Sequence, residues 1–278
     1  RILIFHESDE HDHSYLLDLG EHIFDYEFKS QCKKRNPEFK QWLPEINKIN
    51  IDELNVKPRE TDKSIAFKNG GAYFLKNENF SLMVSCFPIG QNGVGGHNHC
   101  DMGSFTLSYK GKPIIVDPGT YTYTRDFSQR NMFRSLFYHN VSISDEQNTN
   151  KTKILDIFHI NEPVNIFKIK QMKNSIYLNI NNIIKKQFLM YDDSLDIKTE
   201  SNSNSDNYLI INPYLELTID SNTIKLNLPD NHSLNINSKN KILVEDSEYS
   251  NSYQNKVSSK KIIIKSKNKA IIEKYYVN

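Results

Sequence analysis

From Ile65 to the C-terminus, short apolar runs rich in Val, Ile, Tyr and Phe alternate with polar positions. Gly, Asn and Asp interrupt these runs about every ten residues, a spacing typical of the strands of a large sandwich. The clearest runs are residues 72–75, 81–86, 105–109, 114–116, 141–144, 176–180, 208–211, 215–219, 224–228 and 261–264. No repeat of the length of a propeller blade is visible, so a propeller is disfavoured. The pattern predicts an all-β antiparallel sandwich.

The N-terminal part of the chain has a different pattern. Apolar side chains recur there at helical spacing: Leu16, Leu19, Ile23 and Tyr26. They predict an amphipathic helix over residues 14–30. The charged, Pro-containing stretch 33–63 has little periodicity and is interpreted as a linker. We therefore expect a boundary near residue 60, with a helical segment and linker over 1–60 and the sandwich over 61–278.

Composition narrows the classes of function. The 278 residues carry 35 basic and 34 acidic side chains, a formal net charge of +1, without a basic stripe that would follow a phosphate backbone. Neither nucleic acid nor a membrane span is expected, since no apolar run is long enough to cross a bilayer. The 3 cysteines are widely spaced and support neither a disulfide framework nor a Cys-rich zinc module. The chain opens at Arg1 without a signal-like stretch, so we expect it to be part of a longer protein.

One segment concentrates residues that can do chemistry. Residues 95–105 read GGHNHCDMGSF, and an Asp-Pro-Gly turn and a His-Asn pair follow. His97 and His99 are two residues apart, so on an extended chain both point the same way, which suits metal ligation or a reactive imidazole beside a ligand. Asp117 closes an apolar strand at the Pro-Gly turn, where the backbone would hold its carboxylate at the sheet edge. A core histidine and a carboxylate that only caps the turn are the alternatives on these residues alone.

The loop before Ser104 has to fold back if these residues are to meet. A plain hairpin through residues 110–113 places Asp117 opposite Thr106, too far from His99 for contact along extended strands. Glycine permits the positive φ angles that a folded-back loop needs. Four glycines lie in this region: Gly93, Gly95, Gly96 and Gly103. We therefore expect the segment to double back.

The strings GHNHCDMGSF, GKPIIVDPGTYTY and YHN, in this order, resemble the signature of heparinase II/III-like polysaccharide lyases. The string GGAYFLKN and the SDEHD opening with its helix also resemble the connection between the helical toroid and the sandwich of that family. The resemblance implies a large antiparallel β-sandwich (a super-sandwich) with a short α-helical stub left from an (α/α) toroid. It also implies a structural zinc held by His99, Asp117 and His139, with His97 facing the substrate cleft.

Two residues depart from the family pattern. Cys100 stands where the family often has a small residue, and Val141 follows the His-Asn pair in place of the usual Thr. Both leave the implied ligands in place but change the hydrogen bonds around them. Cys100 is not needed as a fourth ligand, because strand alternation points it away from His99, and we expect water or another contact there.

Such relatives cleave uronic-acid-containing polysaccharide by β-elimination. The reaction requires a neutralised sugar carboxylate, a base near C5 and a proton donor for the leaving oxygen. His97 is the candidate acid or base, because histidine titrates near neutral pH. Aromatic and basic residues after the Pro-Gly turn are candidate contacts for an acidic sugar, or else ordinary loop-surface residues. They are Tyr121, Tyr123, Arg125, Arg130 and Arg134.

The resemblance places the remaining catalytic groups, a Tyr with an Asn or His, on the toroid, so the chain alone is expected to be inactive. It implies an acidic polysaccharide and the missing toroid domain as partners, and a periplasmic or secreted location. A non-catalytic carbohydrate-binding sandwich with the same metal site is an alternative. A second is a metal-dependent hydrolase with water at an open zinc position, for which Asp101 is the carboxylate near the motif.

Overall fold

The computed structural model describes residues 15–24, 64–90, 93–149, 153–154, 156, 158–161, 166–228, 232–266 and 269–278. The chain divides into two compact units, residues 1–61 and 62–278. In the first, helix α1 spans Tyr15–Phe24, within the helix predicted over 14–30. The rest of that prediction and the linker predicted over 33–63 lie outside the described residues. No helix of the described chain is both long and apolar enough to cross a membrane.

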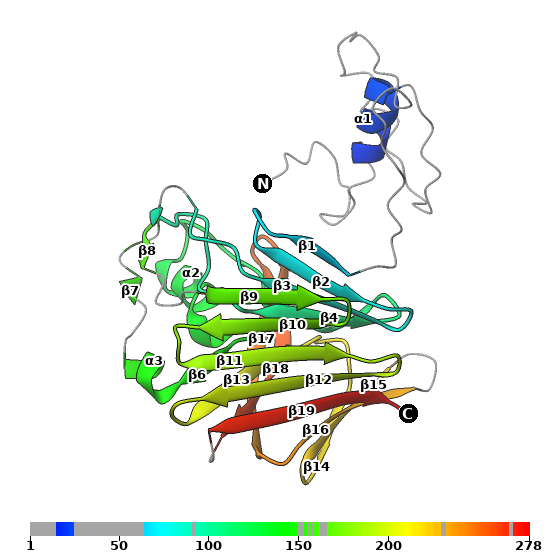
Figure 1. Cartoon of the computed structure of the whole chain (residues 1–278). Coiled ribbons are helices and arrows are strands. Elements are labelled where there is room, and N and C mark those ends of the chain that lie inside the picture. Colours follow the sequence, from blue (N-terminus) through cyan, green and yellow to red (C-terminus); the bar gives the residue numbers. More distant parts are fainter. Residues whose placement is uncertain are drawn as a thin grey trace. The chain divides into compact units, whose positions relative to one another are not determined.

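The second unit is a two-layer antiparallel β-sandwich, which confirms the predicted fold class (Figure 1). The nine-stranded sheet contains β1 (Ile65–Phe67), β2 (Ala72–Lys76), β3 (Phe80–Ser85), β4 (Phe105–Tyr109), β5 (Lys112–Ile115), β6 (Ser142–Ser144), β13 (Ser205–Ile211), β17 (Lys241–Ser252) and β18 (Asn255–Lys265). The eight-stranded sheet contains β9 (Ile166–Met172), β10 (Ser175–Ile180), β11 (Ile184–Met190), β12 (Ser194–Ser201), β14 (Leu217–Asp220), β15 (Thr223–Asn227), β16 (Ser233–Ser238) and β19 (Ala270–Val277).

The strand order shows which segments lie side by side. In the nine-stranded sheet the order is β1-β2-β3-β4-β5-β13-β18-β17, and β6 pairs with β13. In the other sheet the order is β14-β15-β16-β19-β12-β11-β10-β9. Short elements follow β5: α2 (Phe127–Phe133) and a 3₁₀ helix (Leu136–Tyr138) precede β6, whereas α3 (Asp145–Thr149) and the pair β7 (Lys153–Ile154) and β8 (Ile160–Asn161) lie between β6 and β9, where the chain passes to the other sheet. The loops that follow β5 and precede β6 meet beside β13.

Strand alternation builds the core. In β4, buried Phe105, Leu107 and Tyr109 alternate with half-buried polar residues, so one face of the strand packs inward. The rings of Phe105 and Phe188 lie 5.3 Å apart edge to face and join the two sheets. Burial of each such side chain stabilises the fold by roughly 1.5–3 kcal/mol. The core therefore runs continuously between the layers.

A charged pair interrupts this apolar core. Lys186 of β11 and Glu273 of β19 are both buried, and the Lys186 ammonium lies 4.9 Å from the centroid of the Phe105 ring. Glu273 accepts hydrogen bonds from the Asn207 amide and the Tyr275 hydroxyl. Burial lowers the pKa of Lys186 to about 8, although Glu273 acts in the opposite direction. Burial also raises the pKa of Glu273. Glu273 thus links β19 to β13 of the other layer, and Lys186 of β11 contacts the Phe105 ring of β4.

Candidate functional site

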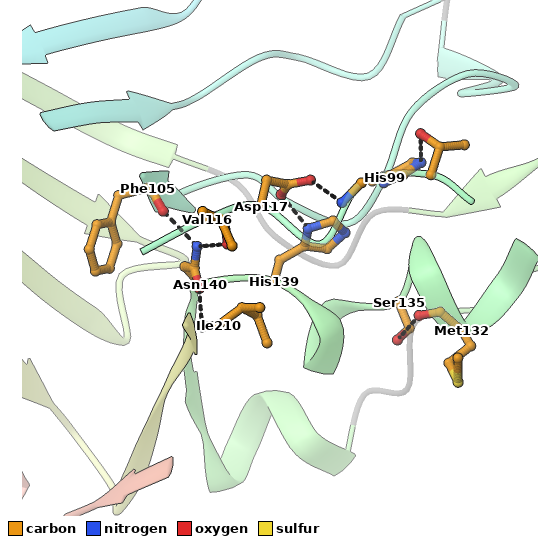
Figure 2. Close-up of polar contacts among 11 residues, drawn as sticks. His99, Phe105, Val116, Asp117, Met132, Ser135, His139, Asn140 and Ile210 are labelled. Carbon is orange, nitrogen blue, oxygen red and sulfur yellow. Dashed lines mark hydrogen bonds and ion pairs between the residues drawn. The ribbon is translucent and has the colours of Figure 1, made fainter. Parts of the chain in front are cut away.

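One buried amide fixes the frame of the site. The Asn140 side-chain nitrogen donates to the carbonyl oxygens of Phe105 (2.8 Å) and Val116 (2.9 Å), and its oxygen accepts from the backbone N–H of Ile210 (2.6 Å) (Figure 2). These three bonds join the start of β4, the residue after β5 and the C-terminal end of β13. Asn140 therefore fixes the backbone from which two of the predicted metal ligands extend.

The predicted metal ligands lie together beside this amide. The side chain of His139 is fully buried, and its Nδ1–H donates to Oδ2 of Asp117 at 2.8 Å. The other carboxylate oxygen accepts the N–H of Gly119 at 3.0 Å. The ring centroids of His99 and His139 are 5.3 Å apart, and Figure 2 shows the Asp117 carboxylate directed toward both imidazoles. The hydroxyl of Thr120 lies 3.5 Å from Nε2 of His99.

The electrostatics of this cluster leave two side chains, His99 and Asp117, in protonation states that can bind a metal. Burial lowers the pKa of His99 to about 3, and His139 acts in the same direction while Asp117 opposes the shift. Burial acts to raise the pKa of Asp117, but the interactions with His139, His99 and the Gly119 N–H outweigh it and hold that pKa below its usual range. At neutral pH His99 is therefore a neutral imidazole and Asp117 a carboxylate, the protonation states in which both can bind a cation.

The side chains of this cluster are of the types that bind zinc, but here they are arranged as a hydrogen-bonded group. Two imidazoles and a carboxylate form a common zinc ligand set. In the described part of the chain, however, no three His, Cys, Asp or Glu side chains have the arrangement of a metal site. A metal that binds here has to replace the hydrogen bond between Asp117 and His139 with bonds to itself.

The glycine-rich loop doubles back as the sequence predicts. Gly93, Gly95 and Gly103 have φ angles of +90°, +70° and +84°. The N–H of Gly103 donates to the carbonyl of Ser85 at 2.7 Å, and the N–H of Ser85 donates to the carbonyl of Ser104 at 2.8 Å. These bonds anchor the end of the loop against β3, and the loop returns His99 toward the end of β5.

His97 and His99 face different surroundings. The segment that carries them is a turn and not an extended strand, so the expectation that both point the same way is wrong. The side chain of His97 is exposed, and its ring centroid lies 5.8 Å from that of Tyr123. His97 is thus available to solvent and to a substrate, while its neighbour is half-buried in the cluster.

Arg130 holds the backbone next to His97 in position. It lies in α2, is fully buried, and donates from Nη2 to the carbonyl of Gly96 at 3.0 Å. Its guanidinium carbon is 4.4 Å from the ring centroid of Tyr123, a cation–π distance. The Tyr123 ring therefore lies in contact with both His97 and Arg130, and Arg130 is a positioning residue and not a surface contact.

The prediction that Arg134 contacts substrate requires a correction. Arg134 is fully buried, and its Nη2 donates to the carbonyl oxygens of Asp156 and His159, both at 2.8 Å. A guanidinium used in this way ties the segment between β7 and β8 to the end of α2. Arg134 thus holds the fold together at this point and does not line a cleft.

Tyr121 and Arg125 lie on the loop after the Pro-Gly turn. Tyr121 is half-buried with a φ of +60°, and its ring lies 5.4 Å from Phe133 and 4.9 Å from the ammonium of Lys256. Arg125 is exposed and donates to the side chain of Gln254, whose own N–H donates to the carbonyl of Tyr121. The turn between β17 and β18 therefore supports the loop that carries both predicted substrate contacts.

Helix α2, which carries Arg130, was not predicted from the sequence. Asp126 caps this helix, since its carboxylate accepts the N–H of Gln129 at 3.0 Å. An Asp before a Ser- and Gln-containing segment is a helix N-terminal signal that the sequence does carry. Asp101 lies near the cluster as well, and burial raises the pKa of its carboxyl.

Comparison with known proteins adds a family and a fold. A family model described as heparinase II/III-like, C-terminal, matches residues 59–275. The heparan sulfate lyase HepC from Pedobacter heparinus has a TM-score of 0.62 at 17% identity, over 81% of this chain and 38% of that one. The heparinase III-BT4657 gene product has a TM-score of 0.59 at 15% identity, over 81% of this chain and 37% of that one. The chain thus spans less than two-fifths of either, and these identities show the fold alone. No curated protein matches.

Proposed function

This chain belongs to the heparinase II/III-like C-terminal domain family, and on that premise we propose that it is the C-terminal domain of a lyase that cleaves uronic-acid-containing polysaccharide by β-elimination. The observation that carries the proposal is the exposed His97 ring, which lies in tilted contact with Tyr123 beside the His99–Asp117–His139 cluster. The solved structures with the same fold are described as a heparan sulfate lyase and as heparinase III. A glycosaminoglycan-like substrate follows from those names.

The elimination removes the proton from C5 of the uronate, forms the C4–C5 double bond and breaks the bond from C4 to the leaving oxygen. We assign one of the proton transfers to His97, because its imidazole is solvent-exposed and histidine is the commonest general acid or base. Arg125 is an exposed cation on the neighbouring loop, which suits it to the sugar carboxylate. Tyr123 supplies an aromatic face beside His97.

The buried residues below this surface hold it in place. Arg130 fixes the carbonyl that precedes His97 and the ring of Tyr123. The Asp117 carboxylate, bonded to His139 and to a backbone N–H, fixes the Pro-Gly turn before the loop of Tyr121. These contacts hold the reacting groups in their positions before the reaction begins, so the groups do not have to rearrange during it.

We also propose a structural zinc on His99, Asp117 and His139. Two neutral imidazoles and a carboxylate are ligands that zinc prefers, and they come from three separate segments of the chain. When bound, the ion would supply a cross-link between these segments, and its binding free energy would add to the stability of the fold.

The rest of the active site is proposed to come from a helical toroid domain. The test therefore uses the longer protein that contains this chain, with a uronate polymer as substrate and ultraviolet absorbance of new unsaturated ends as the readout. His97→Ala should lower the rate by about 100-fold or more, as expected for the loss of a general acid or base. The matched control is His232→Ala, because His232 is exposed and lies before β16 of the other sheet.

Two results would oppose the proposal. Wild-type protein that binds the polymer without forming unsaturated ends would make the chain a carbohydrate-binding module. Equal rates for wild type and His97→Ala would remove His97 from the reaction.

A further inference from the structure

The outer face of the eight-stranded sheet carries lysines at its β9 edge. Lys168 and Lys170 of β9 and Lys185 of β11 are exposed, and Lys198 of β12 is half-buried. Their side chains alternate with core residues such as Ile197, so they lie on the side away from the nine-stranded sheet. Figure 1 shows this face toward the viewer, with β9, β10, β11, β12 and β19 in front.

These four lysines differ from those of the other sheet. Four lysines of β18 form ion pairs with carboxylates at 2.7, 2.5, 3.1 and 2.8 Å. They are Lys256, Lys260, Lys261 and Lys265. None of the four outer-face lysines belongs to an ion pair found in the described part of the chain. The charge of these four lysines is therefore not neutralised by ion pairs among the described residues, although Glu200 lies directly opposite Lys185 across the β11–β12 pair.

Strand register arranges this charge in a row. Lys170, Tyr177, Gln187 and Lys198 are direct cross-strand neighbours on β9, β10, β11 and β12. Strands lie about 4.8 Å apart, so the row is about 14 Å long, with a cation at each end and an aromatic ring and an amide between them. We call these four residues the basic row.

The adjacent row has the same character. Two residues along each strand, Lys168, Asn179, Lys185 and Glu200 are also cross-strand neighbours. The only acidic side chain in these two rows is Glu200, against four lysines. The two rows together carry four lysines, one glutamate and, near their centre, the side-chain amides of Gln187 and Asn179.

We propose that the basic row binds a segment of acidic polysaccharide. Lysine ammonium groups attract sugar carboxylates or sulfates, the half-buried Tyr177 ring offers a face for a pyranose, and amides hydrogen-bond to hydroxyls. The choice of a polysaccharide over another polyanion rests on the proposed function. The basic row lies on the other sheet from the loops of His97 and His99. Because a polysaccharide repeats along its length, one long chain can engage both surfaces and gain affinity from the second contact.

The test measures binding of a heparin-derived octasaccharide to the purified chain by titration calorimetry at low and at moderate salt. Lys170→Glu combined with Lys198→Glu should weaken binding about tenfold, which corresponds to about 1.4 kcal/mol, and should reduce its salt dependence. The matched control is Lys241→Glu combined with Lys260→Glu, two exposed lysines of β17 and β18 with the same change in net charge. This control should bind within about twofold of wild type, and circular dichroism should show that both variants are folded.

Equal weakening in both double variants would overturn the proposal, because net charge alone would then explain the binding. A single-stranded oligonucleotide of the same charge that binds as tightly and is lost in the same variant would make the surface a general polyanion site, and would also overturn it. Loss of the proposed elimination activity is measured separately, so either proposal can fail without the other.

Discussion

His139 Nδ1 lies 2.8 Å from Oδ2 of Asp117, a hydrogen bond between two residues that are 22 positions apart in the chain. The bond joins the Pro-Gly turn after β5 to the segment that enters β6. The buried imidazole and the carboxylate thus stabilise each other. A metal at this site has to contribute more than the hydrogen bond that it replaces.

The zinc proposal predicts metal content that depends on named side chains. Elemental analysis of the purified chain should find about one zinc per molecule, and His99→Ala or Asp117→Ala should lose it with a fall in Tm of about 5 °C or more. Cys100→Ser is the control, because Cys100 is buried outside the ligand set and should keep the metal. A folded wild-type chain that takes up no zinc would exclude the structural metal.

Asn140→Ala should destabilise the domain without touching any exposed residue. Three buried backbone groups lose their partner, at roughly 1–3 kcal/mol for each unsatisfied group, so a loss of about 3 kcal/mol or more is expected. Urea unfolding measures the change. Asn212→Ala removes two side-chain hydrogen bonds, to the Pro113 carbonyl and from the Tyr214 N–H, but both are solvent-exposed, so it should cost less than about 1 kcal/mol. Similar losses in both variants would mean that Asn140 does not fix the frame of the site.

Gly119→Ala should be far more damaging than Gly111→Ala. Both glycines have a positive φ, +83° and +77°, so each substitution costs roughly 1 kcal/mol of backbone strain. A Cβ at Gly119 would also lie 2.0 Å from the carbonyl oxygen of Ser250, whereas a Cβ at Gly111 meets nothing within 4 Å. Thermal unfolding should show at least about 2 kcal/mol of additional loss for Gly119→Ala. Equal losses would contradict the close contact.

The buried Lys186 should make stability depend on alkaline pH. Its folded-state pKa of about 8 lies below the ordinary value of 10.5, so between these pH values the unfolded chain holds a proton that the folded chain has lost. The contribution of Lys186 to the free energy of unfolding therefore rises with pH across this window, by at most about 1.4 kcal/mol per pH unit. Lys186→Met should lack this rise in urea unfolding from about pH 7 to 10. Parallel pH profiles would refute the assignment.

The strands with regular alternation are those that the sequence predicts best. The run predicted over 105–109 coincides with β4, and the run over 176–180 is β10 without its first residue. Four interior strands of the eight-stranded sheet were not predicted: β11, β12, β16 and β19. Their inward positions include Lys186 and Glu273, so a polar residue stands where the pattern requires an apolar one. Only the folded structure shows that these two charges lie together in the core.

The site was partly accessible from the sequence. The spacing of His97 and His99 alone predicted that they could ligate a metal or react. The grouping of His99 with Asp117 and His139 was implied by the family resemblance, and only the folded structure of the loop shows that the three residues lie together. The burial of Arg134 could not be read from the sequence, because arginine is among the residues found most often at the surface. The Arg134 side chain is held by backbone carbonyls of a segment beyond β6, and no local sequence pattern around Arg134 predicts that contact.

Strand β19 lies between β12 and β16, in the interior of its sheet. During synthesis, β12 and β16 are therefore made while the place between them is empty, and each has an unpaired edge until residues 270–277 leave the ribosome. Such edges pair readily with other chains. The domain should consequently be sensitive to premature termination: a chain that stops before Ala270 keeps two open edges and is expected to aggregate, and chaperone demand should fall only after the final strand emerges.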